Sequence, residues 1–551
     1  MKKILLGNEA IVQGALEAGV DFVSAYPGTP SSEIGNIFGK VAKKHGVYFE
    51  FSTNEKTAME AAIGASFSGL KCLVAMKSFG LNVASEALIP FCYTGTKGPT
   101  VIIVADDPSC WSSGQSEQNS RAYAYLAHVP MLEPSDAQEA KDFTKLAFEI
   151  SKKFNIPIIV RITTRVAHQR MPVEMQKTNS KEQRTIGKFV KDVKHFVTMP
   201  PRVLEMKEEL LEKIEKIKDF AEKNKINEIK NHKLKIKNCN LGIITSSISY
   251  LYVMEALKDL NLDLPILKLG FFHPLPETKI KNFIKRFKNV LIVEELEPFL
   301  EKEVKVLAKE INPKLKVFGK DLLPETRELG TEKVMMAIAK LTNRKYKIPR
   351  HYSLALPTRF PRLCPDCSYW LVFSAVKKMA PKGTIFGGDI GCYMLAGFPP
   401  HNIQDYLFCM GSSIGIAHGI KKAVQDQSSK QKLITFIGDS TFFHAGIPAL
   451  VNTVFNKSNP LIIIMDNRIT AMTGHQPNPG MGKTGMGEVT DEIKIENIVK
   501  ACGVKNLKII DPVNIKELQA AIKEFLNKKE VSVIIARRMC AYWAKRLKRK
   551  K

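Results

Sequence analysis

The sequence lacks any apolar run long enough to cross a membrane. Its first apolar stretch, Ile4–Leu6, meets Asn8 and Glu9 too soon to form the core of a signal peptide. It also lacks the aromatic motifs that accompany basic residues in RNA-binding domains. These absences lead us to expect a cytoplasmic protein that binds neither membranes nor nucleic acid.

Acidic residues are few relative to basic ones, 55 against 82, which gives a net charge of +27. A charge of this size attracts nucleic acid, anionic lipid or acidic partners. The lysines are scattered, however, and only residues 545–551 form a basic run. We therefore interpret the charge as that of a lysine-rich surface. The alternative from another functional class is a nucleic-acid-binding protein, which would bind tightly and salt-sensitively without any cofactor.

The 551 residues, 44% of them hydrophobic and 25% charged, have the composition of a globular protein, and their number suggests about three or four domains. Strand-like runs such as Phe22–Ser24 and Val101–Val104 alternate with helical stretches such as Asn54–Phe67, which predicts an α/β fold of parallel sheets flanked by helices. The chain contains 10 cysteines. In a reducing compartment, clustered cysteines indicate metal or redox chemistry more often than disulfides.

The expected domains differ in composition. Residues 1–175 form a first α/β domain, and residues 176–237 form a Lys- and Glu-rich helical connector around a helix near Glu205–Lys225. Residues 238–345 form a second α/β domain, with strands near Leu241–Thr245 and Val290–Val293. Residues 350–545 form a third, which contains most of the informative glycines and cysteines.

Two predicted strands of this third domain end in polar residues. One is followed by Gly438 and Asp439, and the other, Leu461–Met465, is followed by Asn467. The carboxyl ends of parallel strands are where ligands bind. A carboxylate from Asp439, an amide oxygen from Asn467 and the carbonyl oxygen of Ile469 would suit Mg²⁺, which prefers hard oxygen ligands. Gly438 would let the backbone approach a phosphate closely. The spacing matches the motif that binds thiamine diphosphate with Mg²⁺; the alternative is an ordinary turn.

A candidate for the second half of such a site lies in the first domain. Thiamine diphosphate enzymes use a glutamate from another domain to protonate the aminopyrimidine ring. Glu55 follows a strand-like run and opens a predicted helix. The alternative is a helix-start glutamate that only benefits from the helix dipole.

Four cysteines of the third domain form a possible ligand set. Cys364 and Cys367 make a CxxC motif, Cys392 follows a glycine-rich turn, and Cys540 lies near the end of the domain. Four thiolates could hold a [4Fe–4S] cluster or a structural zinc ion. Alternatively, Cys392 and Cys540 are buried side chains without a ligand, because free cysteine packs well in cores.

Taken together and in order, these motifs resemble those of the 2-oxoacid:ferredoxin oxidoreductases. The resemblance is strongest to the large (alpha) subunits of the indolepyruvate ferredoxin oxidoreductases, and it runs from about residue 5 to residue 543. The segments that carry it are 7–10, 25–32, 54–56, 105–108, 364–367, 387–392, 438–440 and 466–474.

The resemblance implies a role for particular residues. Glu55 would activate the cofactor, Thr29 would lie close to the substrate, and the four cysteines would hold a [4Fe–4S] cluster beside the thiamine. Asp439, Asn467 and Ile469 would bind Mg²⁺. The residues expected to contact thiamine diphosphate are Tyr26, Pro27, Gly28, Gly388, Asp389, Gly411, Ser412, Ser413, Gly438, Asp439, Ser440, Asn467 and Thr470.

The implied reaction is the oxidative decarboxylation of aryl pyruvates such as indolepyruvate to acyl-coenzyme A and CO₂, with reduction of ferredoxin. The implied partner is the smaller (beta) subunit. Family members usually continue into a ferredoxin-like domain with further cysteine-rich motifs, which this sequence lacks. We therefore expect electrons to leave through a separate ferredoxin-like subunit or an external ferredoxin, which the basic run 545–551 could attract. A non-oxidative thiamine-dependent 2-oxoacid decarboxylase is the alternative; it would not need the cysteines.

Overall fold

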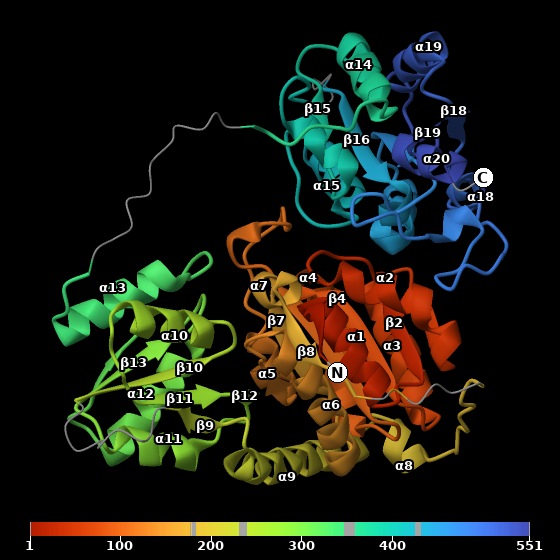
Figure 1. The fold of residues 1–551 in the computed structure, drawn as a ribbon. Helices are drawn as coiled ribbons and strands as arrows, with labels where there is room; N and C mark the ends of the chain where they lie inside the picture. Colours follow the sequence, from red (N-terminus) through yellow and green to blue (C-terminus); the bar gives the residue numbers. More distant parts are fainter. Residues whose placement is uncertain are drawn as a thin grey trace. The chain divides into compact units, whose positions relative to one another are not determined.

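The computed structural model in Figure 1 describes residues 2–176, 178, 183–230, 240–346, 359–424 and 431–549. The chain divides into two compact units, Met1–Tyr352 and Ser353–Lys551, which we call unit 1 and unit 2. The predicted first α/β domain, the connector and the second α/β domain all lie in unit 1. Unit 2 corresponds to the predicted third α/β domain. The finer division of unit 1 stays a prediction.

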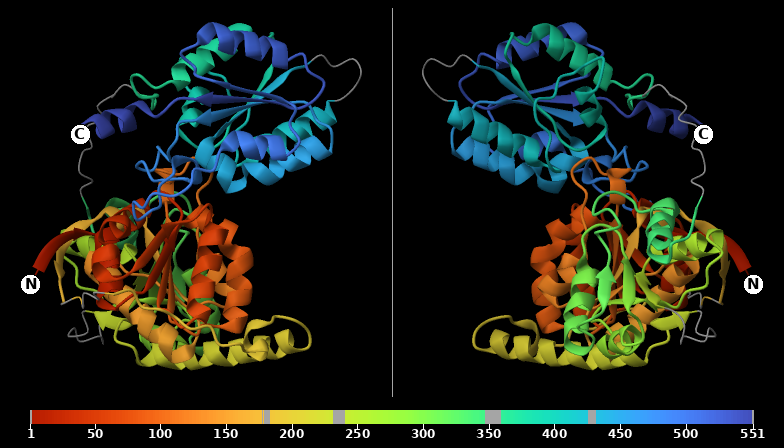
Figure 2. Two further views of the ribbon diagram at one scale, coloured as in Figure 1. Left: turned by 90° about the vertical axis from the view of Figure 1, so that its right-hand side faces the viewer. Right: turned by 90° about the vertical axis from the view of Figure 1, so that its left-hand side faces the viewer.

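The larger sheet of unit 1 has seven strands in the order β12-β6-β7-β5-β4-β2-β3. All neighbours run parallel except β12, which pairs antiparallel with β6. Helices lie on both sides of this sheet (Figure 2), as a doubly covered parallel sheet requires. The strands are β2 (Phe22–Ala25), β3 (Tyr48–Phe51), β4 (Cys72–Lys77), β5 (Thr100–Asp106), β6 (Met131–Leu132), β7 (Ile158–Thr163) and β12 (Phe271–His273).

The helices of this layer pack in pairs. α1 packs on α6 and α3 packs on α4. The predicted strands at Phe22 and Val101 and the helix ending at Phe67 are confirmed by β2, β5 and α3. A two-stranded antiparallel sheet of β1 (Lys2–Leu6) and β8 (Arg170–Glu174) completes the layer. The helices are α1 (Gly7–Glu17), α2 (Ser32–Val41), α3 (Glu55–Phe67), α4 (Ser78–Thr94), α5 (Ala122–Ala127), α6 (Ala137–Phe154) and α7 (Thr164–His168).

The second sheet of unit 1 has five strands in the order β14-β13-β10-β11-β9. Helices α10 and α13 pack against one face and α11 and α12 against the other. The predicted strands at Leu241 and Val290 are confirmed. The elements are β9 (Glu228–Lys230), β10 (Leu241–Ser246), α10 (Ser249–Asp259), β11 (Ile266–Leu269), α11 (Glu277–Ile284), β13 (Asn289–Val293), α12 (Phe299–Ile311), β14 (Lys316–Phe318) and α13 (Thr331–Thr342).

Two short strands cross the expected domain borders. β9 lies inside the predicted connector but pairs with β11 of the second sheet. β12 comes from the predicted second domain but pairs with β6 of the first sheet. Each has only three residues, which is too few to show a hydrophobic period in the sequence.

The predicted connector helix is confirmed by α9 (Arg202–Lys223), which the short α8 (Val193–Phe196) precedes. Its apolar residues recur every three or four positions and are buried, and α9 packs on α4. No helix within the described ranges has the length and apolar character that crossing a membrane requires. The buried residues of α9 are Met206, Leu210, Ile214, Ile217 and Ala221.

A buried ionic network joins the two sheets of unit 1. The Arg121 guanidinium donates to Glu133 at 2.7 Å and to Glu294, which follows β13, at 2.6 Å. Arg161 on β7 donates to Glu133 at 2.8 Å and to Asp106 at 2.7 Å. Burial alone would raise the pKa of Glu133, but the two guanidinium groups lower it to about 2. Each charge is therefore paired, which buried ions require.

We expect Glu133→Gln to destabilise unit 1 by about 3–5 kcal/mol, because it leaves two buried guanidinium groups under-paired. Since the folded-state pKa lies below the ordinary value of 4.5, the wild-type stabilisation is present above that value and is lost as the pH falls toward about 2. Urea unfolding measured between neutral and acid pH would test both expectations. A variant as stable as wild type would contradict them.

Unit 2 contains a five-stranded parallel sheet in the order β15-β16-β17-β19-β18. Along β17, Leu461, Ile463 and Met465 pack toward α14 and α19, whereas Ile462 and Ile464 pack toward α15, α17 and α18. Both faces are therefore covered, which explains the uninterrupted apolar runs. The predicted strands that precede Asp439 and Asn467 are confirmed. The strands are β15 (Ile385–Gly387), β16 (Leu433–Gly438), β17 (Leu461–Asp466), β18 (Asn506–Ile510) and β19 (Ser532–Arg537).

The helices of unit 2 connect these strands and cover the sheet (Figure 2). The turn after β16 continues into a single π-helical turn, Phe442–Gly446, a conformation that is frequent at functional sites. The helices are α14 (Tyr369–Met379), α15 (Ser412–Ala423), α16 (Asp439–Thr441), α17 (Ile447–Phe455), α18 (Ile495–Ala501), α19 (Ile515–Phe525) and α20 (Ala541–Lys548).

Candidate active site

The ends of β16 and β17 bring the predicted magnesium ligands to one edge of the sheet. The two strands are parallel neighbours, with Gly438 opposite Met465. Asp439 and Asn467, which follow them, are both buried. The Asp439 carboxylate accepts hydrogen bonds from the Ser440 backbone N–H at 2.9 Å and from the Asn478 side-chain amide at 3.2 Å. The sequence analysis did not single out Asn478, which lies in a loop without a motif.

The electrostatics at this edge favour a bound cation. Burial, followed by the charge of nearby Asp466, raises the pKa of Asp439 to about 7. Asp466 is already paired with Arg537 at 2.6 Å, so the charge of Asp439 is the less compensated of the two. The side-chain oxygen of Asn467 accepts one hydrogen bond, from the Ile469 N–H at 3.1 Å, and keeps a second lone pair. The residues present therefore fit the hard-oxygen ligand set of Mg²⁺.

Two further predicted residues connect the same strand ends. The Thr470 hydroxyl donates to the Ser440 hydroxyl at 2.9 Å. Thr470 also exchanges two backbone hydrogen bonds with Gln476, at 3.0 and 3.2 Å, and these close the loop after β17. This loop therefore stays near the start of α16.

The glycine-rich turn after β15 supports the N-terminus of α15. The buried carboxylate of Asp389 accepts hydrogen bonds from the backbone N–H groups of Gly411 and Ser413, at 2.8 and 2.9 Å. Burial raises the pKa of Asp389 to about 6, although these N–H groups act in the opposite direction. The Ser412 N–H donates to the carbonyl of Cys409. All three backbone N–H groups are thus used within the protein, and their contact with a diphosphate stays a prediction.

Gly438 has a packing role beside the one predicted for it. A Cβ atom at this position would lie 2.7 Å from the ring of Tyr393. The Tyr393 hydroxyl donates to the carbonyl of Ile390 at 2.7 Å and lies 3.1 Å from the hydroxyl of Thr441. The absence of a side chain at Gly438 therefore lets Tyr393 connect the turn after β15 to α16.

The four predicted ligand cysteines lie close enough in unit 2 for their charges to affect the ionisation of Cys367 and Cys392. Burial raises the pKa of Cys392 to about 12, and Cys367, Cys540 and Cys364 add to this effect. Burial likewise raises the pKa of Cys367 to about 11, with contributions from Cys364 and Cys540. The described residues contain no group of three or more side chains placed to hold a single metal ion. The assignment of the four cysteines to a [4Fe–4S] cluster stays a prediction.

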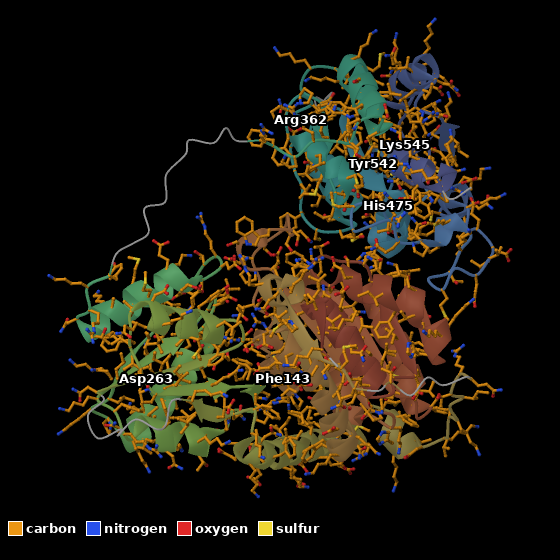
Figure 3. All side chains as sticks on the ribbon, in the orientation of Figure 1. Phe143, Asp263, Arg362, His475, Tyr542 and Lys545 are labelled. Atoms are coloured by element: carbon orange, nitrogen blue, oxygen red, sulfur yellow. The ribbon has the colours of Figure 1, made fainter. Side chains whose placement is uncertain are left out.

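α20 is connected to both the CxxC motif and the loop after β17. Lys545 forms an ion pair at 2.8 Å with Asp366, which lies between Cys364 and Cys367. The His475 ring stacks on Trp543 at 5.9 Å, and its Nε2 lies 3.7 Å from the sulfur of Cys540. Figure 3 labels His475 and Lys545 in this part of unit 2. The sequence analysis missed His475, because a lone histidine in a loop gives no signal.

Unit 1 contains the predicted acid and substrate-contacting residues. Glu55 is the first residue of α3 and is buried, and the preceding Asn54 side chain accepts the Thr57 N–H at 2.8 Å. A Cβ atom on Gly80 would lie 2.6 Å from Glu55 Cγ, so α4 approaches this side chain closely. Thr29, in the loop after β2, has its hydroxyl 3.5 Å from that of Ser32.

The remaining predicted contacts of unit 1 lie in the same loop. Tyr26 is buried, Pro27 and Gly28 follow it, and a Cβ atom on Gly28 would lie 2.8 Å from the side chain of Lys77. Because β2 and β3 are parallel neighbours, the loop after β2 and Glu55 lie at the same edge of the sheet. No sequence motif had identified Lys77 as a candidate site residue.

Comparison with known families agrees with this arrangement. Residues 389–536 match the family described as thiamine pyrophosphate enzyme, C-terminal TPP binding domain. Residues 13–233 match the family described as pyruvate flavodoxin/ferredoxin oxidoreductase, thiamine diphosphate-binding. The first segment contains Asp389, Asp439 and Asn467, and the second contains Thr29 and Glu55.

The most informative relatives match almost the whole chain. The indolepyruvate oxidoreductase subunit IorA of Pyrococcus horikoshii is 43% identical, over 98% of this chain and 86% of its own length. The IorA subunit of Archaeoglobus fulgidus is 39% identical, over 100% of this chain and 88% of its own length. The chain belongs to the IorA family. It is therefore a thiamine-diphosphate-binding subunit of a 2-oxoacid:ferredoxin oxidoreductase.

A solved structure supports the fold of this IorA-family chain. The 2-oxoglutarate:ferredoxin oxidoreductase of Magnetococcus marinus aligns with a TM-score of 0.50 at 17% identity, covering 62% of this chain and 65% of that one. At this identity the likeness concerns the fold alone. The expected α/β architecture of a thiamine-diphosphate-binding fold, with parallel sheets flanked by helices, is confirmed.

We expect Asp439→Asn to weaken Mg²⁺-dependent binding of thiamine diphosphate about 100-fold or more, because a charged ligand of a buried cation is removed. Calorimetric titration of thiamine diphosphate with and without Mg²⁺ would measure the change. Asp491→Asn, at an exposed position of unit 2, is the matched control and should bind normally. Equal affinity of Asp439→Asn and wild type would remove Asp439 from the site.

Proposed function

We propose that this chain is the large subunit of an indolepyruvate:ferredoxin oxidoreductase, which oxidatively decarboxylates aryl pyruvates to acyl-coenzyme A and CO₂ and reduces ferredoxin. The names of the IorA relatives support the choice of indolepyruvate. The oxidative step is supported by the cysteines of unit 2. The smaller (beta) subunit would supply the remaining catalytic domain.

One contact carries the proposal. The backbone N–H of Cys540 donates a hydrogen bond to the carbonyl oxygen of Asn467 at 3.1 Å. The backbone of a proposed cluster ligand is therefore in contact with the backbone of a proposed magnesium ligand. In addition, Asp439 adds to the electrostatic effects that raise the pKa of Cys392. A cluster held by these thiolates would therefore lie next to the diphosphate end of the cofactor site, and short separations favour electron transfer. A non-oxidative decarboxylase would gain nothing from this arrangement.

In the proposed reaction, thiamine diphosphate supplies the carbon nucleophile for the keto carbon of the 2-oxo acid and takes up the electron pair that remains when CO₂ leaves. Glu55 would hold the proton on the aminopyrimidine ring, and its buried position protects that proton from exchange with water. Thr29 would lie near the reacting carbon. Asp439, Asn467 and the Ile469 carbonyl would hold Mg²⁺ against the diphosphate.

The bond between the keto carbon and the carboxylate breaks, and CO₂ leaves. A bond between the acyl carbon and sulfur forms to coenzyme A, whose thiol loses its proton. Cys364, Cys367, Cys392 and Cys540 would hold the [4Fe–4S] cluster, which would supply an acceptor for the two electrons, taken one at a time on their way to ferredoxin or a ferredoxin-like subunit.

The proposal is tested by iron and acid-labile sulfide analysis of anaerobically purified protein. We expect about four irons per chain and an electron paramagnetic resonance signal after dithionite reduction. Cys364→Ser should lose the signal and ferredoxin reduction while keeping thiamine diphosphate. Cys409→Ser, at an exposed cysteine outside the proposed ligand set, is the matched control and should behave as wild type.

A chain that contains thiamine diphosphate but no iron would contradict the oxidative proposal. The same conclusion would follow if Cys364→Ser retained full ferredoxin reduction with the partner subunit present. If the wild-type enzyme released CO₂ without transferring electrons to ferredoxin, it would be a non-oxidative decarboxylase.

A further inference from the structure

Lys77 is a charged side chain that no part of the proposed mechanism uses. It is the last residue of β4 and precedes the first residue of α4. In the sheet, β4 lies between β2 and β5, and Lys77 is paired with Ala105 of β5. The loops that follow β2 and β5 therefore flank it. This is the edge of a parallel sheet at which ligands bind.

The neighbouring backbone leaves room for this side chain. A Cβ atom on Gly28 would lie 2.8 Å from both Cγ and Cδ of Lys77. At the start of α4, Gly80 gives the same freedom to Glu55, whose Cγ would be 2.6 Å from a Cβ atom there. Two glycines thus let one acid and one base extend at the same edge of the sheet. The substrate-contacting loop from Tyr26 to Thr29 passes directly over the stem of the lysine.

The ammonium of Lys77 has incomplete compensation within the described part of the chain. Its Nζ lies 4.6 Å from the centre of the Phe79 ring. Burial lowers the pKa of Lys77, and the more distant charges of Asp107 and Glu55 only partly oppose this effect. Asp107 itself is bonded to Ser112 and Thr164. Lys77 is partly buried, and a cation that loses part of its hydration is stabilised when an anion completes its surroundings.

We infer that Lys77 binds the carboxylate of the 2-oxo acid substrate and so places the keto carbon near Thr29 and Glu55. The inference rests on the proposed function and adds a specificity-determining residue to it. The ammonium would supply a charge-assisted hydrogen bond to the carboxylate before CO₂ leaves. The ammonium would bind the neutral acyl product more weakly than the substrate, because the product has lost the carboxylate.

The test uses the complete enzyme with its partner subunit and the non-reactive probes 3-phenylpropanoate and 3-phenylpropanamide as competitive inhibitors of phenylpyruvate oxidation. Wild type should bind the acid better than the amide. Lys77→Met and Lys77→Gln should raise KM for phenylpyruvate about 100-fold and abolish the preference for the acid, because the cation that pairs with the carboxylate is lost. Lys77→Arg should keep part of the preference. Lys97→Met, at an exposed lysine paired with Asp192, is the control.

A second readout separates this role from an indirect one. Exchange of the thiazolium proton with deuterated water, followed without substrate, reports activation of the cofactor by Glu55. It should stay at the wild-type rate in both neutral variants if Lys77 binds substrate. A slower exchange with an unchanged preference for the acid would show that Lys77 acts through Glu55 and would overturn the inference.

The outcomes also distinguish the inference from the proposed function. If wild type prefers the acid and both neutral variants keep that preference, Lys77 does not bind the carboxylate and the proposed function stands. If wild type neither binds nor oxidises aryl pyruvates, the proposed function itself fails.

Discussion

The chemistry of this chain depends on the geometry of parallel strands, which end together at one edge of a sheet. In unit 2, β16 and β17 place Asp439 and Asn467 side by side. β19 runs parallel to β17, and Cys540, which follows β19, donates a backbone hydrogen bond to Asn467. In unit 1, β2, β3 and β4 do the same for Thr29, Glu55 and Lys77. The apolar strands determine where these edges lie. The polar residues just beyond the strands give each edge its proposed chemistry.

Burial at these edges sets the electrostatics of the site. Burial raises the pKa values of Asp439, Asp389, Cys392 and Cys367, which is the expected effect of a low-dielectric environment on groups that become negative. Such groups are costly without a cation. In unit 1 the buried Glu133 has its cations supplied by Arg121 and Arg161. Asp439 of unit 2 accepts hydrogen bonds from a backbone N–H and a side-chain amide, which do not neutralise its charge, and this is consistent with a site that binds a cation.

Much of this organisation could be predicted from the sequence. Long apolar runs identified strands in both units, and the spacing of Gly438-Asp439 and Asn467 picked out candidate magnesium ligands. The choice of Glu55 also needed the family resemblance, and the roles of these residues stay predictions. The strands β9 and β12 could not be predicted, because three residues show no period and their pairing is decided by tertiary contacts. Lys77, His475 and Asn478 were missed for a related reason. Their positions follow from how loops fold back, and no local motif marks them.

The central claim is that electrons from the thiamine site pass to a cluster within the same chain. Rapid-freeze electron paramagnetic resonance of the anaerobic holoenzyme, mixed with phenylpyruvate but without ferredoxin, tests it most directly. The account predicts that the spectrum of a reduced [4Fe–4S] cluster appears as CO₂ is released, and that Cys540→Ser abolishes it. Release of CO₂ with no change in the spectrum of the wild-type protein would contradict the account.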